Sequence, residues 1–237
     1  MLIEVEMNWR NLDWLENARN LLIWLANVKN SSPALLAIRR SHREVIRTFD
    51  EMAETGITEL GHDMAREFGK RIPVELDIQI LHSFIPRCRQ TAESIAEGFR
   101  DIGGTVKRVK SFGLLIGPRV IDLELWNRVG DDGVGVASFV NDWADGLFPQ
   151  EGIEPFGEFK NRLLKGTIGI PRGTEPGLLH TCVTHDLFLV IAKSTYLRLR
   201  VTDEDRPPFL GGFGLVTEAE QVLFYEKGAA RKVVIGF

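Results

Sequence analysis

The chain has 237 residues, 44% of them hydrophobic, and a formal net charge of −4. This length and apolar content allow a sizeable core, and we expect a single domain of the α/β class. The net negative charge argues against nonspecific binding to nucleic acid, so a cluster of arginines in this chain indicates a focused pocket for a small anion. Cys88 and Cys182 are too few for a disulfide framework or a zinc ribbon.

No apolar run approaches the ~20 residues that a transmembrane helix needs. The amino terminus carries acidic residues where a signal peptide would be basic. We therefore expect a protein of the reducing cytoplasm without membrane contact. The composition does not define an oligomeric state.

The first pattern along the chain is that of an amphipathic helix. From Trp9 to Val28, apolar residues recur at spacings of three and four. This predicts one helix, within an amino-terminal extension over residues 1–30, that packs on a sheet. The alternative is a stripe that binds a partner protein. Residues 30–33 predict the turn into the first strand.

The first strand is predicted at Leu35–Ile38, an apolar run typical of a strand buried on both faces of a parallel sheet. The residues that follow are Arg39, Arg40, Ser41, His42 and Arg43. Ligands of such sheets lie beyond the carboxyl ends of the strands, and guanidinium groups match the paired oxygens of phosphate. Histidine is suited to attack or to transfer a proton near neutral pH. The stretch indicates either an anion pocket or a solvated, basic strand end.

Residues 44–56 are polar and irregular, which predicts a loop over the arginine cluster that acts as a lid. Thr58 then begins a helix that ends at Gly69, because threonine is a favoured N-cap residue and glycine a common C-terminal stop. His62, in the first turn, is expected to be exposed.

A second strand is predicted at Leu76–Ser83, followed by a helix over Arg87–Phe99. Arginine again stands where a strand gives way to a helix. Gly103 and Gly104 precede a short third strand at Thr105–Val109.

Residues 111–177 hold many glycines and prolines, with helical patterns at about 136–147 and 156–164. We expect a helical insertion that caps the pocket. Leu178–Thr184 then predicts another buried strand, ended by His185 and Asp186 and followed by a helix through Tyr196.

The carboxyl-terminal segment predicts a hairpin. Its strands are expected at Val222–Tyr225 and Lys232–Phe237, around a Lys227–Gly228 turn.

Polar functional groups follow three of these strands. They are Arg39, Arg40, His42 and Arg43; Ser83 and Arg87; and His185 and Asp186. Parallel strands open their carboxyl ends on the same edge, so we expect these groups to meet. Phosphoryl transfer from a monoester needs guanidinium groups for the phosphate oxygens, an imidazole that attacks and an acid for the leaving oxygen. His180 and His185 are five apart on one strand, hence on opposite faces, and no metal site is expected.

These motifs resemble the histidine phosphatase superfamily, which includes phosphoglycerate mutases, acid phosphatases and phytases. The family's first strand ends in Arg-His-Gly-x-Arg or a close variant, where this chain has Arg39-Arg40-Ser41-His42-Arg43. The segment Ser83–Glu93 looks like the family's Ser-Pro-Leu-x-Arg-Ala-x-Gln-Thr-Ala. Thr58–Gly61 is similar to its Leu-Thr-x-x-Gly helix start, and Thr184–Asp186 resembles the His-Asp pair of the acid-phosphatase branch.

The resemblance implies a three-layer α/β/α sandwich with a mostly parallel sheet and an antiparallel edge, the phosphoglycerate mutase-like fold. It implies that Arg39, Arg43 and Arg87 bind phosphate with help from His185, and that Asp186 donates a proton to the leaving group. The implied ligand is a small phosphorylated molecule or inorganic phosphate, with no cofactor and no metal.

The family's nucleophilic histidine falls on Arg40, whose guanidinium stays protonated and has no lone pair suited to attack. The resemblance therefore implies a phosphomonoester phosphatase impaired at this position, either naturally or as a variant of an active enzyme. One alternative is a non-catalytic protein that binds a phosphorylated ligand. Another is a phosphatase that uses His42, which lies on the same side of an extended segment as position 40.

Overall fold

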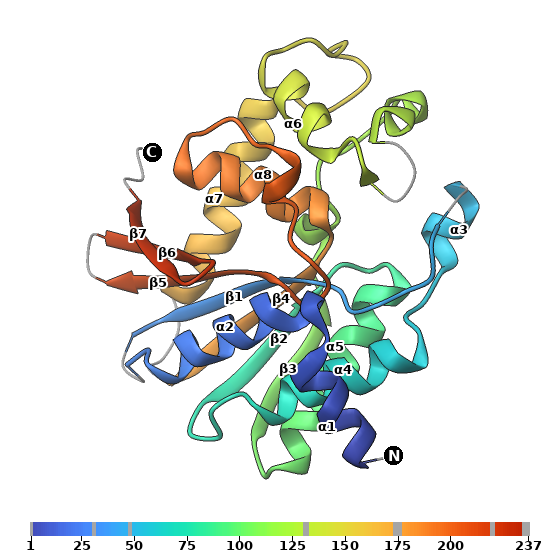
Figure 1. Cartoon of the computed structure of the whole chain (residues 1–237). Helices are drawn as coiled ribbons and strands as arrows, with labels where there is room; N and C mark the ends of the chain where they lie inside the picture. Colours follow the sequence, from blue (N-terminus) through green and yellow to red (C-terminus); the bar gives the residue numbers. More distant parts are fainter. Residues whose placement is uncertain are drawn as a thin grey trace.

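The computed structural model describes residues 2–29, 32–46, 49–129, 133–172, 177–218 and 221–233. Its centre is a seven-stranded sheet of order β3-β2-β4-β1-β5-β6-β7 (Figure 1). The strands are β1 (Ala34–Arg39), β2 (Asp77–His82), β3 (Thr105–Ser111), β4 (Leu178–Thr184), β5 (Gly212–Glu218), β6 (Gln221–Glu226) and β7 (Ala229–Val233). The pairs β1–β4, β2–β4 and β2–β3 are parallel, and the pairs from β1 through β5 and β6 to β7 are antiparallel.

Helices cover both faces of the sheet (Figure 1). The helices are α1 (Leu2–Asn11), α2 (Glu16–Ala26), α3 (Phe49–Glu54), α4 (Glu59–Lys70), α5 (Pro86–Asp101), α6 (Val136–Ala144), α7 (Phe156–Arg172) and α8 (Asp186–Leu197). The predicted three-layer α/β/α sandwich with an antiparallel edge is confirmed.

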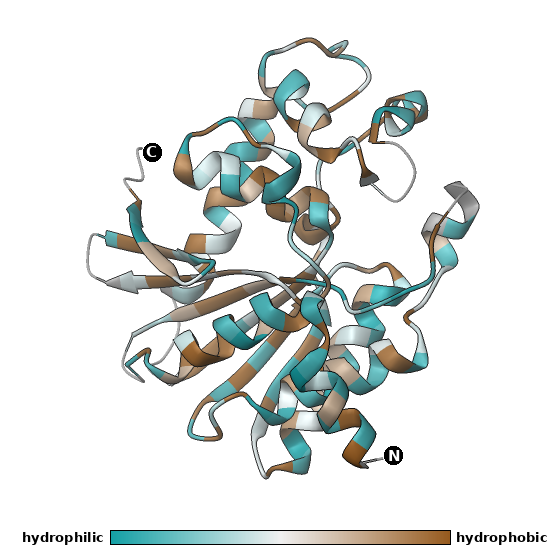
Figure 2. Cartoon of the chain, in the orientation of Figure 1, coloured by the Kyte–Doolittle hydropathy of each residue, from teal (hydrophilic) through white to brown (hydrophobic). Residues whose placement is uncertain are grey.

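Strand β1 divides the core into two halves, because alternate side chains point to opposite faces. Leu36 and Ile38 pack with residues of α2, α4 and α5, whereas Leu35 and Ala37 pack with residues of α7 and α8. Figure 2 shows hydrophobic residues along the central strands. All six residues of β1 are buried, as the apolar run predicted for a strand at Leu35–Ile38.

The amino-terminal prediction of one helix over Trp9–Val28 is wrong. Helix α1 ends at Asn11, a 3-10 turn covers Asp13–Leu15, and α2 begins at Glu16. The break lets the two halves bury their apolar faces against different elements. Trp9 packs edge-on against Phe68 of α4, whereas α2 lies along β5.

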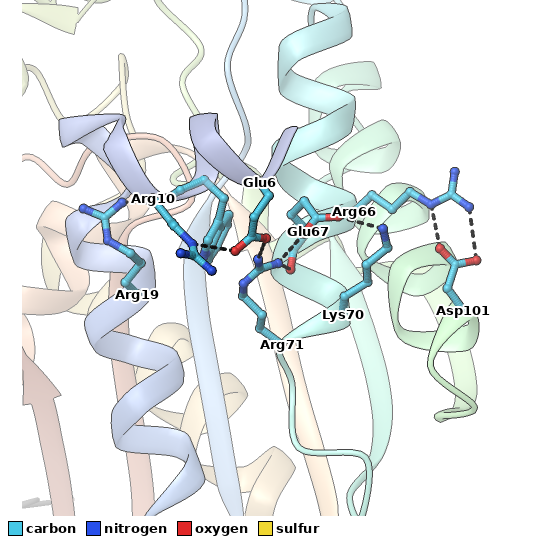
Figure 3. Close-up of polar contacts among 9 residues, drawn as sticks. Glu6, Arg10, Arg19, Arg66, Glu67, Lys70, Arg71 and Asp101 are labelled. Carbon is cyan, nitrogen blue, oxygen red and sulfur yellow. Dashed lines mark hydrogen bonds and ion pairs between the residues drawn. The ribbon is translucent and has the colours of Figure 1, made fainter. Parts of the chain in front are cut away.

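Ion pairs fasten α1 to α4, as Figure 3 shows. The guanidinium of Arg71, just after α4, pairs with Glu6 of α1 and with Glu67 of α4. It also lies 4.6 Å from the ring centre of Trp9. These contacts hold α1 against the carboxyl-terminal end of α4.

Gly69, which suggested the end of a helix, lies inside α4 instead. Helix α4 starts after Thr58, whose Oγ1 accepts from the Gly61 amide at 3.1 Å, as predicted, but it continues through Gly69 to Lys70. A Cβ at Gly69 would lie 2.1 Å from the Ile95 carbonyl oxygen of α5, so this glycine permits close helix packing.

Strand β5 was not predicted, and glycines again explain why. Gly212 and Gly214 look like loop residues, yet a Cβ at Gly212 would lie 1.9 Å from the Ala37 carbonyl oxygen of β1. A Cβ at Gly214 would lie 2.1 Å from the ring of Trp24 in α2. The strand needs glycine because neighbouring groups approach its backbone closely.

The terminal hairpin is confirmed at the Lys227–Gly228 turn, where both residues have positive φ, 48° and 81°. Its second strand starts at Ala229 rather than Lys232, and residues 234–237 lie outside the described part. The predicted loop over residues 44–56 contains the short helix α3, since Glu, Met and Ala favour helix. Residues 30–31 of the predicted first turn also lie outside the described ranges.

The remaining predicted elements are present with shifted ends. Strand β3 runs on to Ser111 and α5 to Asp101. Helix α7 continues past the predicted residue 164 to Arg172, so Gly166 lies inside the helix. A Cβ at Gly166 would lie 2.3 Å from the side chain of Leu114. The single-domain boundaries and the capping role of residues 111–177 stay predictions. Among the described helices, none has the length and apolar character needed to cross a membrane.

Candidate anion-binding site

The carboxyl ends of β1, β4 and β2 are adjacent in the sheet and bring the predicted polar groups to one edge. Backbone hydrogen bonds between neighbouring strands continue to these ends. The Arg40 amide donates to the Thr184 carbonyl at 2.9 Å, and the Ser83 amide donates to the Val183 carbonyl at 3.0 Å. Arg39, at the end of β1, therefore lies beside Asp186, and Arg87 of α5 lies beside His185.

Four arginines of this edge are buried. Their exposed fractions are 5% for Arg39, 3% for Arg40, 8% for Arg43 and 6% for Arg87. Burial lowers the pKa of Arg40 well below its usual range, and the charges of Arg39 and Arg43 lower it further. Burial also lowers the pKa of Arg87. Concentrated, desolvated positive charge of this kind favours an anion.

Asp186 is held as a carboxylate. Its Oδ2 lies 2.9 Å from Arg39 Nη2 and accepts from Arg206 Nε at 2.8 Å, and its Oδ1 accepts from the Leu187 amide at 3.0 Å. Burial by itself would raise the pKa of Asp186, but the charges of Arg39 and Arg206 outweigh it and keep this pKa far below its usual range. Near pH 7 this side chain is therefore ionised and carries no proton to donate.

His185 lies between the serine and arginine that follow β2. Its Nε2 is 3.0 Å from Ser83 Oγ, and its Nδ1 is 3.5 Å from Arg87 Nη2. Burial, together with the charges of Arg87 and Arg40, lowers the pKa of His185 well below its usual range. The imidazole is therefore neutral near pH 7, with Nδ1 accepting from the arginine and Nε2–H donating to the serine.

Cys88 lies beside this histidine, with Sγ 3.6 Å from His185 Nε2. Burial raises the pKa of Cys88 to about 12, even though Arg87 and Arg40 act in the opposite direction. Cys88 is thus a buried cysteine of α5 whose thiol stays protonated near pH 7. Cys88 and Cys182 are both free and buried.

Arg40 directly follows the last residue of β1 and is 3% exposed. Its Nη1 donates to the Ser41 carbonyl at 3.1 Å, and its guanidinium lies 4.8 Å from the ring centre of Phe209. The guanidinium of Arg39 lies 4.6 Å from the same ring centre. Cation–π contacts therefore hold both arginines against one aromatic side chain.

His42 has different neighbours. Its Nδ1 is 2.8 Å from Thr58 Oγ1, and its ring lies 6.1 Å from that of Trp14 and 5.1 Å from that of Phe209, between ring centres. Burial lowers the pKa of His42, partly opposed by Glu44 and aided by Arg40. The ring is thus neutral near pH 7, held by the cap of α4 and by aromatic contacts.

The segment from Arg206 to Gly211 lines the site and escaped sequence analysis. Pro207 accepts from Arg39 Nη1 at 3.1 Å through its carbonyl, and the Leu210 amide donates to the Arg39 carbonyl at 3.0 Å. Phe209 contacts Arg39, Arg40 and His42, as described above. One signal was available in the sequence: an arginine, two prolines and a phenylalanine in succession, a stiff segment with one charged and one aromatic side chain.

The other histidines are structural in their surroundings. His62 is exposed, as predicted, with Nδ1 2.9 Å from Ser94 Oγ. His82 is buried, with Nδ1 2.9 Å from the carbonyl oxygen of Ser83, to which it donates. His180 is 2% exposed, and neither of its ring nitrogens has a hydrogen-bond partner within the described ranges. Those ranges contain no group of three or more His, Cys, Asp or Glu side chains arranged to hold a metal.

His180 gives a pH-dependent stability. Burial lowers the pKa of His180 to about 4. As the pH falls from 6.5 to about 4, His180 takes up a proton in the unfolded state but not in the folded state. Acid therefore favours unfolding, and the free energy of unfolding decreases by up to about 3 kcal/mol. Above pH 6.5 both states are neutral and the effect vanishes. Urea unfolding at pH 7.5 and pH 4.5 measures it.

The matched variants for this measurement are His180→Leu, which removes the buried titration, and His62→Gln, which changes an exposed histidine. In His180→Leu, the free energy of unfolding should decrease less between pH 7.5 and pH 4.5 than in the unmodified protein. In His62→Gln, the decrease should equal that of the unmodified protein. Equal declines in the unmodified protein and His180→Leu would contradict the prediction.

Comparison with known proteins extends the fold assignment. No protein-family model matches the sequence, and no curated protein matches it significantly. Among solved structures, YhfR of Bacillus stearothermophilus superposes with a TM-score of 0.52 at 20% identity, over 85% of this chain and 95% of that one. Phosphoglycerate mutase from Bacillus anthracis superposes with a TM-score of 0.51 at 14% identity, over 87% and 94%. The chain therefore has the phosphoglycerate mutase-like fold that its motifs predicted.

Proposed function

We propose that this protein binds the phosphate group of a small phosphomonoester, or inorganic phosphate, and that Arg40 impairs its hydrolysis. The observation that carries the proposal is the gathering of buried Arg39, Arg40 and Arg87 around neutral His185 at the ends of β1, β2 and β4. Guanidinium groups and a neutral imidazole bind phosphate oxygens through charge-assisted hydrogen bonds. The phosphoglycerate mutase-like fold supports the same interpretation.

In the proposed site, Arg39, Arg43 and Arg87 hold the phosphate oxygens and His185 stabilises the charge that develops on them. Hydrolysis requires a nitrogen that attacks phosphorus while a proton reaches the departing alcohol oxygen, the role assigned to Asp186. At position 40 the attacking nitrogen is missing, because arginine has no suitable lone pair. Phosphate binding without efficient turnover is therefore the expected behaviour.

We assign the protein to the cytoplasm, with a small-molecule ligand and without nucleic acid or membrane as partner. A phosphatase that attacks through His42 is the second candidate, favoured by the neutral imidazole that hydrogen-bonds Thr58 at 2.8 Å. Attack from His42 Nε2 would require Nδ1–H to donate to Thr58.

The test uses the unmodified chain. Calorimetry with inorganic phosphate and with vanadate should show binding, while turnover of p-nitrophenyl phosphate should be marginal. If the chain is instead active, His42→Ala should abolish turnover and acid quench should trap a phosphohistidine at position 42, whereas His62→Ala, at an exposed histidine, should change neither. Absence of both binding and turnover would overturn the proposed function.

A further inference from the structure

Arg206 makes the most direct contact with Asp186. Its Nε and Nη2 lie 2.8 and 2.6 Å from Asp186 Oδ2, the same oxygen that lies 2.9 Å from Arg39 Nη2. The carboxylate is thus shared between an arginine of the phosphate-binding strand end and one from a distant loop. No family motif in the sequence contains Arg206.

The loop that carries Arg206 is anchored to the helix that carries Asp186. Asp205, the preceding residue, pairs with Lys193 of α8 at 2.7 Å and closes a capping box with Thr202. Lys193, 7% exposed, also pairs with Glu226 of β6 at 2.5 Å. Because Asp186 is the first residue of α8, both partners of the Arg206–Asp186 contact are held by one helix. Such support restricts the geometry of the pair.

The insertion approaches the same pair. Gly133 has φ +80°, and a Cβ there would lie 2.9 Å from Arg206 Nη2 and 3.3 Å from Asp186 Oδ2. Only glycine allows the backbone to pass this close in that conformation. Gly133 of the insertion therefore lies next to the Arg206–Asp186 contact, in addition to α8 and the loop that carries Arg206.

We infer that Arg206 is a positioning residue that holds the Asp186 carboxylate ionised beside Arg39. The inference deepens the proposed function and rests on it for its functional meaning. While Arg206 stays in contact, Asp186 competes with a bound phosphate for Arg39 and withholds the proton that a leaving group would need. Two features of the chain thus oppose hydrolysis: Arg40 supplies no nucleophile, and Asp186 stays deprotonated and cannot act as the acid.

The other groups that face Asp186 have to be considered in any pH measurement. They are Arg39 and Arg40 at the end of β1, Arg87 and Cys88 on α5, His185 beside it, and Arg206 itself. Only Arg39 and Arg206 are in salt-bridge contact with its carboxylate, as far as the described residues go. Removing Arg206 therefore leaves Arg39 as the one direct cationic partner.

The first test needs no ligand. Carbon-13 NMR of side-chain carboxyls, with Asp186→Asn to assign the signal, follows the titration of Asp186. Arg206→Gln should increase the proton affinity of this carboxylate about tenfold or more, because an adjacent cation shifts a carboxyl pKa by about one to three units. Arg206→Lys, which keeps the charge, should restore most of the original titration.

The matched control is Arg200→Gln. Arg200 precedes the same loop and pairs with Asp145 at 2.6 Å on an exposed surface away from the site. It should leave the Asp186 titration unchanged. An Asp186 titration in folded Arg206→Gln equal to that of the unmodified protein would overturn the inference, whatever the site binds.

The second test measures protons that accompany phosphate binding, by calorimetry at pH 5.5 in buffers of different ionisation enthalpy. Once phosphate engages Arg39, Arg206→Gln leaves the Asp186 carboxylate without a cation in direct contact, so this variant should take up more protons than the unmodified protein. Equal proton uptake would contradict the inference. If no variant binds phosphate, the proposed function fails, and the carboxyl titration still decides the role of Arg206.

Discussion

Replacing Arg40 with histidine should create phosphatase activity, raising turnover of p-nitrophenyl phosphate by at least about a hundredfold over the unmodified chain. That figure is the low end of what one positioned catalytic side chain contributes. The variant supplies the attacking nitrogen at the end of β1, where Arg39, Arg87 and His185 are already gathered. Because Asp186 is held ionised by Arg39 and Arg206, this activity should increase as the pH falls.

The controls separate a new nucleophile from a general loss of charge. Arg40→Gln removes the cation without adding a nucleophile and should stay inactive. Arg89→His introduces a histidine on the exposed side of α5, where Arg89 lies 4.0 Å from Glu93, and should also stay inactive. If Arg40→His binds phosphate yet hydrolyses no member of a broad phosphomonoester panel, catalysis at position 40 is excluded and the binding-protein alternative is favoured.

Replacing Arg87 with alanine should weaken phosphate binding by at least about tenfold, because a charge-assisted hydrogen bond contributes about 1.5–3 kcal/mol. Arg87 is 6% exposed and lies 3.5 Å from His185 Nδ1, so its removal takes away one cation and one partner of the imidazole. Isothermal calorimetry with inorganic phosphate measures the change.

Arg89→Ala is the matched control for this variant, since Arg89 stands two positions along the same helix but is exposed. It should bind phosphate like the unmodified protein. Unchanged affinity in a folded Arg87→Ala variant would mean that the anion site lies elsewhere.

Several elements were predictable from local sequence because their determinants are local. The apolar run at Leu35–Ile38 defines a doubly buried strand, the Thr58 hydroxyl caps its own helix, and Lys227–Gly228 adopts the positive φ values of a tight turn. The gathering of polar groups at strand ends was also predictable, since parallel strands share the direction of their carboxyl ends.

Glycine-rich and interrupted segments were not predictable, because their conformation depends on what lies next to them. Gly212 and Gly214 belong to a strand whose neighbours, β1 and Trp24, leave no room for a side chain. The helix predicted over Trp9–Val28 breaks after Asn11, where each half finds a different surface to cover. Periodicity identifies an apolar face but does not tell how many elements share it.

The sequence by itself determined the parallel strands of the sheet, the helices that follow them and the positively charged end of β1, since these follow from periodicity, capping and the polarity of parallel strands. Only the tertiary structure decided the state of the site. It brought Arg206 to Asp186, Phe209 to the guanidinium groups of Arg39 and Arg40, and Trp14 to His42. These contacts join residues far apart in the chain, and the protonation of a buried group depends on the charges and desolvation around it rather than on its neighbours in sequence.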